Sequence, residues 1–359
     1  MEAIGILDDL FRYSAWANDR IFTLCEGLGD AELDAPREMG FGSLRNTLFH
    51  ILAAEEIWWE RWNGEPWRPF QTDAEGLGLA SIRERLEIVD RKRRELLDRE
   101  RSSGWIRNCS YQDAKGNTHC FPLHHLVHHV ANHGIYHRAQ ALSYLKGYGR
   151  TVVGGLDYLF FRLARPAVGQ EPTANFALQQ WGLEVASGTS PVLAWQPDVI
   201  ANYFAYNEWA NAKILAHLLS LDPAALDRDW GMGLGSIRKT ILHLWDAERW
   251  WLRNGMEGSA EYERSPVTTT IEDLQSGWRQ TIERRRAFLS GLGSDSVVAN
   301  RLVAATIKGV SLRIPLVETL VQLGGHGTHH RAQLANMLRH SGVKLPGLDY
   351  LVWIRERAG

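Results

Sequence analysis

The chain has 359 residues, 45% of them hydrophobic, which is enough for two domains that each bury a core. Its 40 basic and 42 acidic side chains nearly balance, so we expect a small-molecule partner and neither nucleic acid nor membrane. The first residues carry no basic stretch followed by an apolar run, and no segment reaches the roughly 18 apolar residues of a membrane span. Three cysteines, an odd number, predict no disulfide framework, and we expect a cytoplasmic protein.

Residues 7–28 carry apolar side chains at intervals of three and four, which predicts a first helix with one buried face. Ser43 precedes a second such pattern and is the expected N-cap of a second helix. A third helix is predicted over residues 81–101, with a charged side facing solvent. Two strand-like runs around Gly116 predict a small hairpin, and a fourth helix follows over residues 123–146. A short last piece begins at Leu156-Asp157-Tyr158.

The second half repeats this order at an offset of 193 residues, for example Trp16-Ala17-Asn18 as Trp209-Ala210-Asn211. A repeat of this length is a whole domain, because solenoid units have periods of only about 20 to 50 residues. The expected fold class is all-α: two tandem up-and-down four-helix bundles, each with a small hairpin between its third and fourth helices. The expected boundaries are residues 1–165 for the first bundle, 166–197 for a linker and 198–359 for the second bundle.

Three histidines in each half obey the same offset: His50, His133 and His137, then His243, His326 and His330. The last two of each set are four residues apart on the fourth helix, so their rings lie on one face about 6 Å apart along the axis. Three neutral imidazoles suit a divalent transition metal such as zinc, nickel, iron or copper rather than calcium or magnesium. Three protein ligands leave a coordination position free, which is typical of catalytic sites.

His129 and Gln322 occupy equivalent positions one turn before the histidine pairs of the fourth helices. We expect them to support the metal ligands or to contact a substrate or cofactor, and the alternative is a hydrogen-bonded polar residue in a hydrated channel. Arg138 and Arg331 directly follow the last histidine of each set, off the ligand face. The expected partners of these arginines are Asp157 and Asp349, with an anionic thiol or carboxylate as the functional alternative.

These residues resemble the DinB-like (YfiT-like) superfamily of metal-binding four-helix bundles. The resemblance rests on the Trp-Ala-Asn segments, on Leu48-Phe49-His50 and Ile241-Leu242-His243, and on the two His-x-x-x-His-Arg-x-Gln runs. It implies two metal sites, each made of one tri-histidine set. Members of the superfamily include transferases for thiols such as bacillithiol or mycothiol, a thiol-dependent isomerase and metal-dependent hydrolases.

The leading hypothesis is a metal-dependent enzyme in which the ion activates a low-molecular-weight thiol cosubstrate for S-transfer. A metal-dependent hydrolase and a non-catalytic metal-binding module are the alternatives. No catalytic side chain beyond the ligands can be named from the sequence. We also expect the two halves to form an intramolecular pseudo-dimer, because a covalent link raises their effective concentration to about millimolar.

Overall fold

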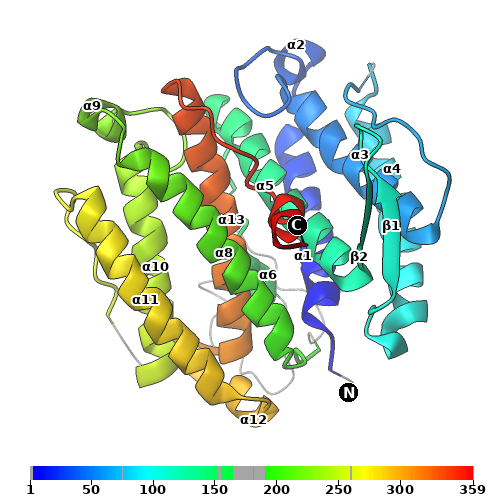
Figure 1. The fold of residues 1–359 in the computed structure, drawn as a ribbon. Helices are drawn as coiled ribbons and strands as arrows, with labels where there is room; N and C mark the ends of the chain where they lie inside the picture. Colours follow the sequence, from blue (N-terminus) through cyan, green and yellow to red (C-terminus); the bar gives the residue numbers. More distant parts are fainter. Residues whose placement is uncertain are drawn as a thin grey trace. The chain divides into compact units, whose positions relative to one another are not determined.

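The computed structural model describes residues 3–74, 76–152, 155–164, 181, 191–258 and 261–358. The chain contacts divide it into two compact units, and each unit combines segments that are distant in sequence (Figure 1). The first-repeat unit contains Leu10–Arg150 and Asp349–Gly359. The second-repeat unit contains Met1–Asp9 and Thr151–Leu348.

Four long helices build the first-repeat unit: α1 (Ile6–Cys25), whose first four residues belong to the other unit, α3 (Leu44–Asn63), α4 (Leu79–Glu100) and α5 (Leu123–Gly147). Helix α3 packs against both α4 and α5. The short helices α2 (Asp30–Leu33) and η1 (Arg101–Ser103) lie in the connections. Strands β1 (Asn108–Gln112) and β2 (Thr118–Pro122) form the predicted antiparallel hairpin, in which Cys109 faces Phe121. The four predicted helices and the hairpin of this repeat are confirmed.

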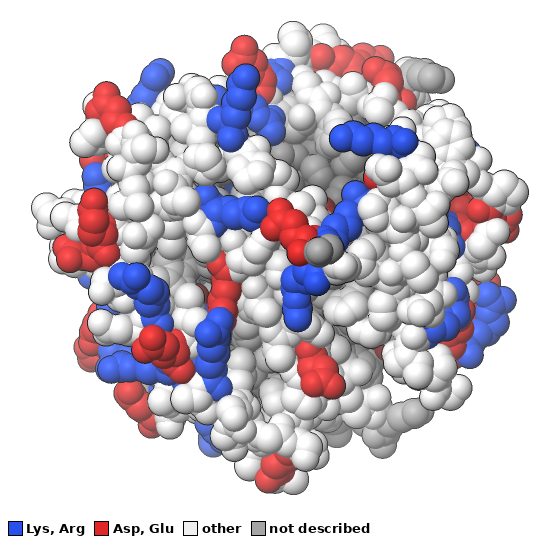
Figure 2. Space-filling view, in the orientation of Figure 1, with Lys and Arg blue, Asp and Glu red and all other residues white. Residues whose placement is uncertain are grey.

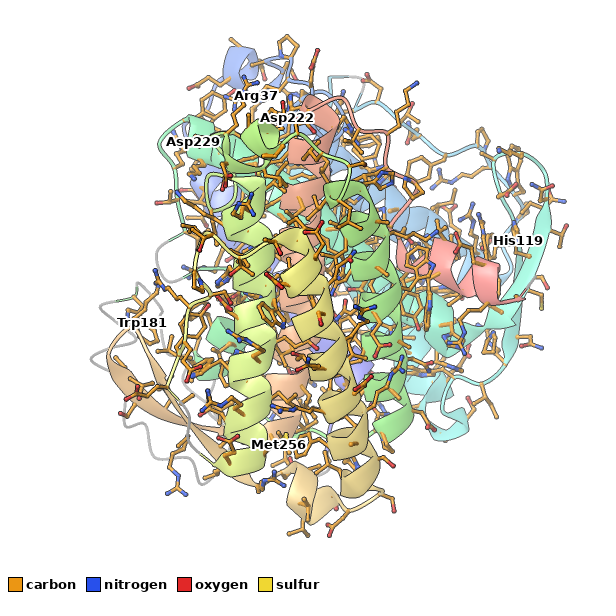
Figure 3. The ribbon with its side chains drawn as sticks, turned by 60° about the vertical axis from the view of Figure 1, so that its left-hand side comes forward. Arg37, His119, Trp181, Asp222, Asp229 and Met256 are labelled. Atoms are coloured by element: carbon orange, nitrogen blue, oxygen red, sulfur yellow. The ribbon has the colours of Figure 1, made fainter. Side chains whose placement is uncertain are left out.

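The second-repeat unit contains the matching long helices α8 (Pro197–Leu218), α10 (Ile237–Glu257), α11 (Ile271–Leu292) and α13 (Leu316–His340). They run side by side in Figure 3, where Met256 marks the C-terminal end of α10. Strands β3 (Leu302–Ile307) and β4 (Val310–Pro315) form the second hairpin, and α9 (Pro223–Asp227) and α12 (Ser296–Ala299) are short. The fold is therefore two four-helix bundles in tandem, as predicted.

The helices that carry histidines begin at defined positions in both repeats. The Ser43 hydroxyl accepts a hydrogen bond from the Asn46 amide at 3.1 Å, which confirms the predicted N-cap. At the equivalent position of the second repeat, the Ser236 hydroxyl accepts one from the Lys239 amide at 3.2 Å. Strands β2 and β4 each end in a proline, after which α5 and α13 begin at once. These starts fix which residues of each helix face the bundle interior.

The piece that follows the fourth helix is exchanged between the repeats. Helix α6 (Tyr158–Leu163) belongs to the second-repeat unit and packs against α13, although it follows α5 in sequence. Helix α14 (Tyr350–Ala358) belongs to the first-repeat unit and packs against α5. The compact units thus combine segments from both repeats, because sequence periodicity carries no information about which copy a terminal segment contacts. The expected boundaries at 1–165 and 198–359 remain a prediction about the two repeats. Most of the expected linker, residues 165–180 and 182–190, lies outside the described residues.

Charged side chains of both signs are spread over the surface of the protein (Figure 2). Lys and Arg side chains lie among Asp and Glu side chains on the face shown in Figure 2. Among the described helices, none is both long enough and apolar enough to cross a membrane. Cys25, Cys109 and Cys120 are free thiols, and the first two are buried.

Candidate metal centres

In the first-repeat unit, α3 and α5 bring the three predicted histidines together. The Nε2 atoms of His50 and His133 are 3.0 Å apart, and the ring centroids of His133 and His137 are 4.3 Å apart. One nitrogen from each of the three rings lies within 4.8 Å of the others. His50 is buried and the other two rings are partly exposed, so the cluster sits at the edge of the core.

The second-repeat unit builds the same cluster from α10 and α13. The Nε2 atom of His326 lies 3.1 Å from the Nε2 atom of His243 and 3.1 Å from that of His330. All three rings again offer a nitrogen within 4.8 Å of one another. Both clusters thus join one histidine of the second long helix to the histidine pair of the fourth long helix.

Two glutamines fix the protonation state of the last histidine in each cluster. The Nδ1 atom of His137 lies 2.8 Å from Oε1 of Gln140, and the Nδ1 atom of His330 lies 2.8 Å from Oε1 of Gln333. An amide oxygen only accepts, so each Nδ1 carries the proton and each Nε2 presents its lone pair to the cluster. The sequence analysis gave these glutamines no role, although both follow their histidine at the same spacing in the repeated His-Arg-x-Gln run.

The second cluster shows why the rings fit a cation. A neutral imidazole places at most one proton on the Nε2 atom of His326, yet that atom has two Nε2 neighbours at 3.1 Å. Because the Nε2 atom of His330 holds a lone pair, the three nitrogens cannot all be satisfied by hydrogen bonds among themselves. A divalent cation satisfies them together, and imidazole is a preferred ligand of zinc, nickel, iron and copper. The donor set therefore fits a transition metal ion.

Burial keeps the imidazoles neutral and available to a cation. It lowers the pKa of His50 to about 2, and the nearby His137 and His129 act in the same direction. Burial likewise lowers the pKa of His137, His243 and His330 to about 4 each. At neutral pH these rings have no proton to lose before they bind a metal.

The two clusters differ around their first histidine. The ring of Phe41 stacks on His50 with centroids 3.7 Å apart, and Nδ1 of His50 is buried with no hydrogen-bond partner among the described residues. Nδ1 of His243 instead lies 3.1 Å from the Tyr262 hydroxyl. The first cluster thus has an apolar cover and the second has a polar one.

His129 and Gln322 take equivalent positions beside the two clusters. Nδ1 of His129 lies 2.7 Å from Oδ1 of Asp349 in the first-repeat unit. In the second-repeat unit, Gln322 donates through Nε2 to Oδ2 of Asp157 at 3.2 Å. Both residues are buried, with 4% and 3% of their surface exposed. Each of them therefore contacts the aspartate of an exchanged Leu-Asp-Tyr segment.

The expected pairing of Arg138 and Arg331 with these aspartates is wrong. Arg138 donates to Oδ1 of Asn18 at 3.1 Å, and Arg331 donates to Oδ1 of Asn211 at 3.0 Å. Each arginine follows its ligand by one residue, about 100° around the helix, and so points at the first long helix of its bundle. These hydrogen bonds, the first partly buried and the second buried, join the first and fourth helices and leave the aspartates to other partners.

A duplicated helical bundle with a tri-histidine cluster in each copy defines the class of protein. The chain belongs to the DinB family, whose model matches residues 4–171 and again residues 196–357. The double match confirms the tandem duplication and the resemblance drawn from the sequence. No curated protein matches the chain.

Proposed function

We propose that each tri-histidine cluster holds one divalent transition-metal ion, with His50, His133 and His137 as ligands in the first repeat and His243, His326 and His330 in the second. The observation that carries this proposal is the convergence of three neutral imidazole nitrogens in both units. Three ligands leave coordination positions for a small molecule. A bound ion there supplies Lewis acidity and lowers the pKa of a thiol or water that binds to it.

The reaction we propose is thiol S-transfer. A low-molecular-weight thiol releases its proton to solvent water, its sulfur forms a bond to an electrophilic carbon, and the bond from that carbon to the leaving group breaks, with the leaving group keeping the electron pair. The chain contributes neutral ligands, because the buried imidazoles leave the ion its full positive charge. Gln140 and Gln333 orient one ligand ring at each site through Nδ1.

Metal-dependent hydrolysis is the second candidate, and one contact favours it. His129 and Asp349 form a close pair one helical turn from His133, and in this reaction the pair accepts the proton of the attacking water. The second repeat has a glutamine at the position of His129, so this argument applies to the first site alone.

We further propose that the partner is a small molecule and that the two repeats work as an intramolecular pseudo-dimer. The duplication supports the second point, because one chain supplies two homologous bundles in a fixed ratio. No contact between the units enters this proposal.

The test is an assay of the metal-loaded full chain against an aryl halide and an ester, each with bacillithiol, mycothiol, glutathione or no thiol. Turnover of the halide only with a thiol supports S-transfer, whereas ester cleavage without a thiol supports hydrolysis. Tight metal binding with neither activity supports the non-catalytic module. The control is H137A/H330A, in which each site loses one imidazole, and any turnover that it retains at the parent rate does not arise at these sites.

A further inference from the structure

Each repeat carries Leu-Asp-Tyr at the start of its last short helix, and the Asp-Tyr pair of each copy lies in the compact unit of the other repeat. Asp157 follows α5 in sequence but belongs to the second-repeat unit. Asp349 follows α13 but belongs to the first-repeat unit. A carboxylate from one copy of the repeat is therefore placed among the helices that carry the histidines of the other copy.

At the first site, Asp349 is held in place beside the cluster. Its Oδ1 accepts a hydrogen bond from the Leu351 amide at 2.7 Å and lies 2.7 Å from Nδ1 of His129. Burial raises the pKa of Asp349, but the contact with His129 holds that pKa below the ordinary range. The ring of His129 in turn lies beside His133, with centroids 5.6 Å apart, so a single side chain separates the carboxylate from the cluster. The Asp349 side chain remains 31% exposed to solvent.

At the second site, Asp157 takes the equivalent place with a different partner. Gln322 donates to the Asp157 carboxylate at 3.2 Å and accepts from the Leu159 amide at 2.9 Å. One side chain thus binds the segment at two points. Burial lowers the pKa of His243 and His330, and the negative charge of Asp157 opposes that shift in both. Gln322 precedes His326 by one turn of α13, so its contact places the Asp157 carboxylate beside the face of the helix that carries the histidine pair.

The tyrosine that follows each aspartate anchors the exchanged segment. The Tyr350 hydroxyl lies 3.0 Å from Nδ1 of His125, and the Tyr158 hydroxyl donates to Oδ2 of Asp9 at 2.5 Å. Tyr350 and Tyr158 are almost fully buried, with 1% and 2% exposed. Two different sets of partners thus hold equivalent segments in equivalent places, which indicates that the position of the aspartate matters more than the chemistry that fixes it.

We propose that Asp349 and Asp157 are positioning residues of the tri-histidine sites, so that each site is completed by the carboxylate of the other repeat. This inference rests on the proposed function in one respect, namely that a cation occupies the sites. Three neutral imidazoles leave a divalent ion with its whole charge, and a fixed carboxylate nearby compensates part of it without entering the ligand set.

The test uses full-length proteins with one site each. H326A/H330A removes the second set of ligands and gives the first-site protein, and H133A/H137A gives the second-site protein. Affinity for Co²⁺ is measured by competition with a chelator at pH 7, and the visible spectrum of bound Co²⁺ reports its coordination.

In the first-site protein, Asp349→Asn should weaken Co²⁺ binding by about tenfold or more, whereas Asp157→Asn should change it less than about twofold. In the second-site protein the two results should be reversed, so each substitution is the matched control of the other. Asp349→Glu keeps the charge and should restore most of the affinity in the first-site protein. The metal-free variants should unfold at the temperature of their parents.

Three results would count against this assignment. An effect of Asp157→Asn on the first-site protein would show that each aspartate serves its own repeat. Unchanged Co²⁺ affinity for both aspartate variants in both single-site proteins would show that neither aspartate is a positioning residue. The same conclusion would follow if the affinity fell only in variants that also unfold at a lower temperature. A full-length chain that binds no Co²⁺ at all overturns the proposed function as well, whereas Co²⁺ binding without thiol turnover overturns only the proposed reaction.

Discussion

In each cluster, Nε2 of the last histidine points at the other rings, and a hydrogen bond from Nδ1 of the same ring fixes the orientation of that imidazole. In both units the last histidine of the cluster donates through Nδ1 to a glutamine three residues later. The orientation of Gln333 is itself fixed, because its Nε2 atom lies 3.0 Å from a nitrogen of His329. A chain of hydrogen bonds thus sets which nitrogen of His330 carries its proton.

Replacing single ligands should remove metal from one site at a time. His137→Ala and His330→Ala should each lose about one equivalent of bound metal, because each leaves only two imidazoles in one cluster. Mass spectrometry of the purified, metal-loaded proteins measures the content. His340→Ala, a change of an exposed histidine at the end of α13, should keep both equivalents. Loss of both equivalents from either ligand variant would contradict independent sites.

The glutamines should tune affinity without supplying a ligand atom. Gln140→Leu removes the acceptor for Nδ1 of His137 and should weaken metal binding at the first site about 10- to 100-fold. Gln140→Glu keeps an acceptor and makes it anionic, so its affinity should equal or exceed that of the parent protein. Calorimetric titration with Zn²⁺ compares the variants, and equal affinities for the leucine and glutamate variants would show that the hydrogen bond has no influence.

Among the secondary-structure elements, the fourth long helix of each bundle carries the histidine pair. Its close packing against neighbouring helices fixes the position of that pair. Helix α13 is buried over most of its length and contacts α8 and α10. Gly324, two residues before His326, lies directly against the ring of Tyr203 on α8. The absence of a side chain at this position lets the two helices approach.

Gly324→Ala should therefore destabilise the second-repeat unit. The added methyl group would overlap the Tyr203 ring, and such overpacking costs about 1 to 3 kcal/mol, more than the roughly 1 kcal/mol that alanine gains over glycine in a helix. Gly291→Ala is the matched control, because a methyl group at that position of α11 meets no atom within 4 Å. Denaturant unfolding should show a loss of stability for the first variant and none for the second.

The sequence predicted the elements better than it predicted their partners. Apolar periodicity, Ser43 and Ser236 indicated the long helices, and the repeated histidines indicated which rings meet. The pairing of Arg138 was wrong because a spacing along one helix says which way a side chain points but not which helix it meets there. The exchange of α6 and α14 could not be predicted for a related reason. Both helices begin at the tyrosine of the same Leu-Asp-Tyr sequence, so the sequence does not indicate which of the two bundles each helix packs against.

For the molecule as a whole, the buried imidazoles make stability depend on pH. The six clustered histidines have pKa values held below the ordinary value of about 6.5 by burial, to about 4 in His137, His243 and His330. Between these values the unfolded chain binds protons that the folded chain does not. Stability must therefore fall as the pH falls through this window.

The unfolding temperature of the metal-free protein should accordingly fall steadily as the pH is lowered from about 6.5 to about 4. Added Zn²⁺ should raise the unfolding temperature most near neutral pH, because protons compete with the ion at lower pH. Differential scanning calorimetry across this range measures both effects. A variant with all six ligand histidines changed to phenylalanine should show a shallower fall, and an equal slope would assign the pH dependence to other groups.

The position of α14 in the first-repeat unit also delays completion of that unit during synthesis of the chain. The first-repeat unit needs α14, and the contact between His125 and Tyr350 spans 225 residues of sequence. A ribosome adds about 5 to 20 residues each second, so the first bundle waits on the order of 10 to 40 s for its last helix after its own final residues have been made. Until then the surface of α5 that α14 will cover is open, and chaperones have their longest opportunity to bind the nascent protein there.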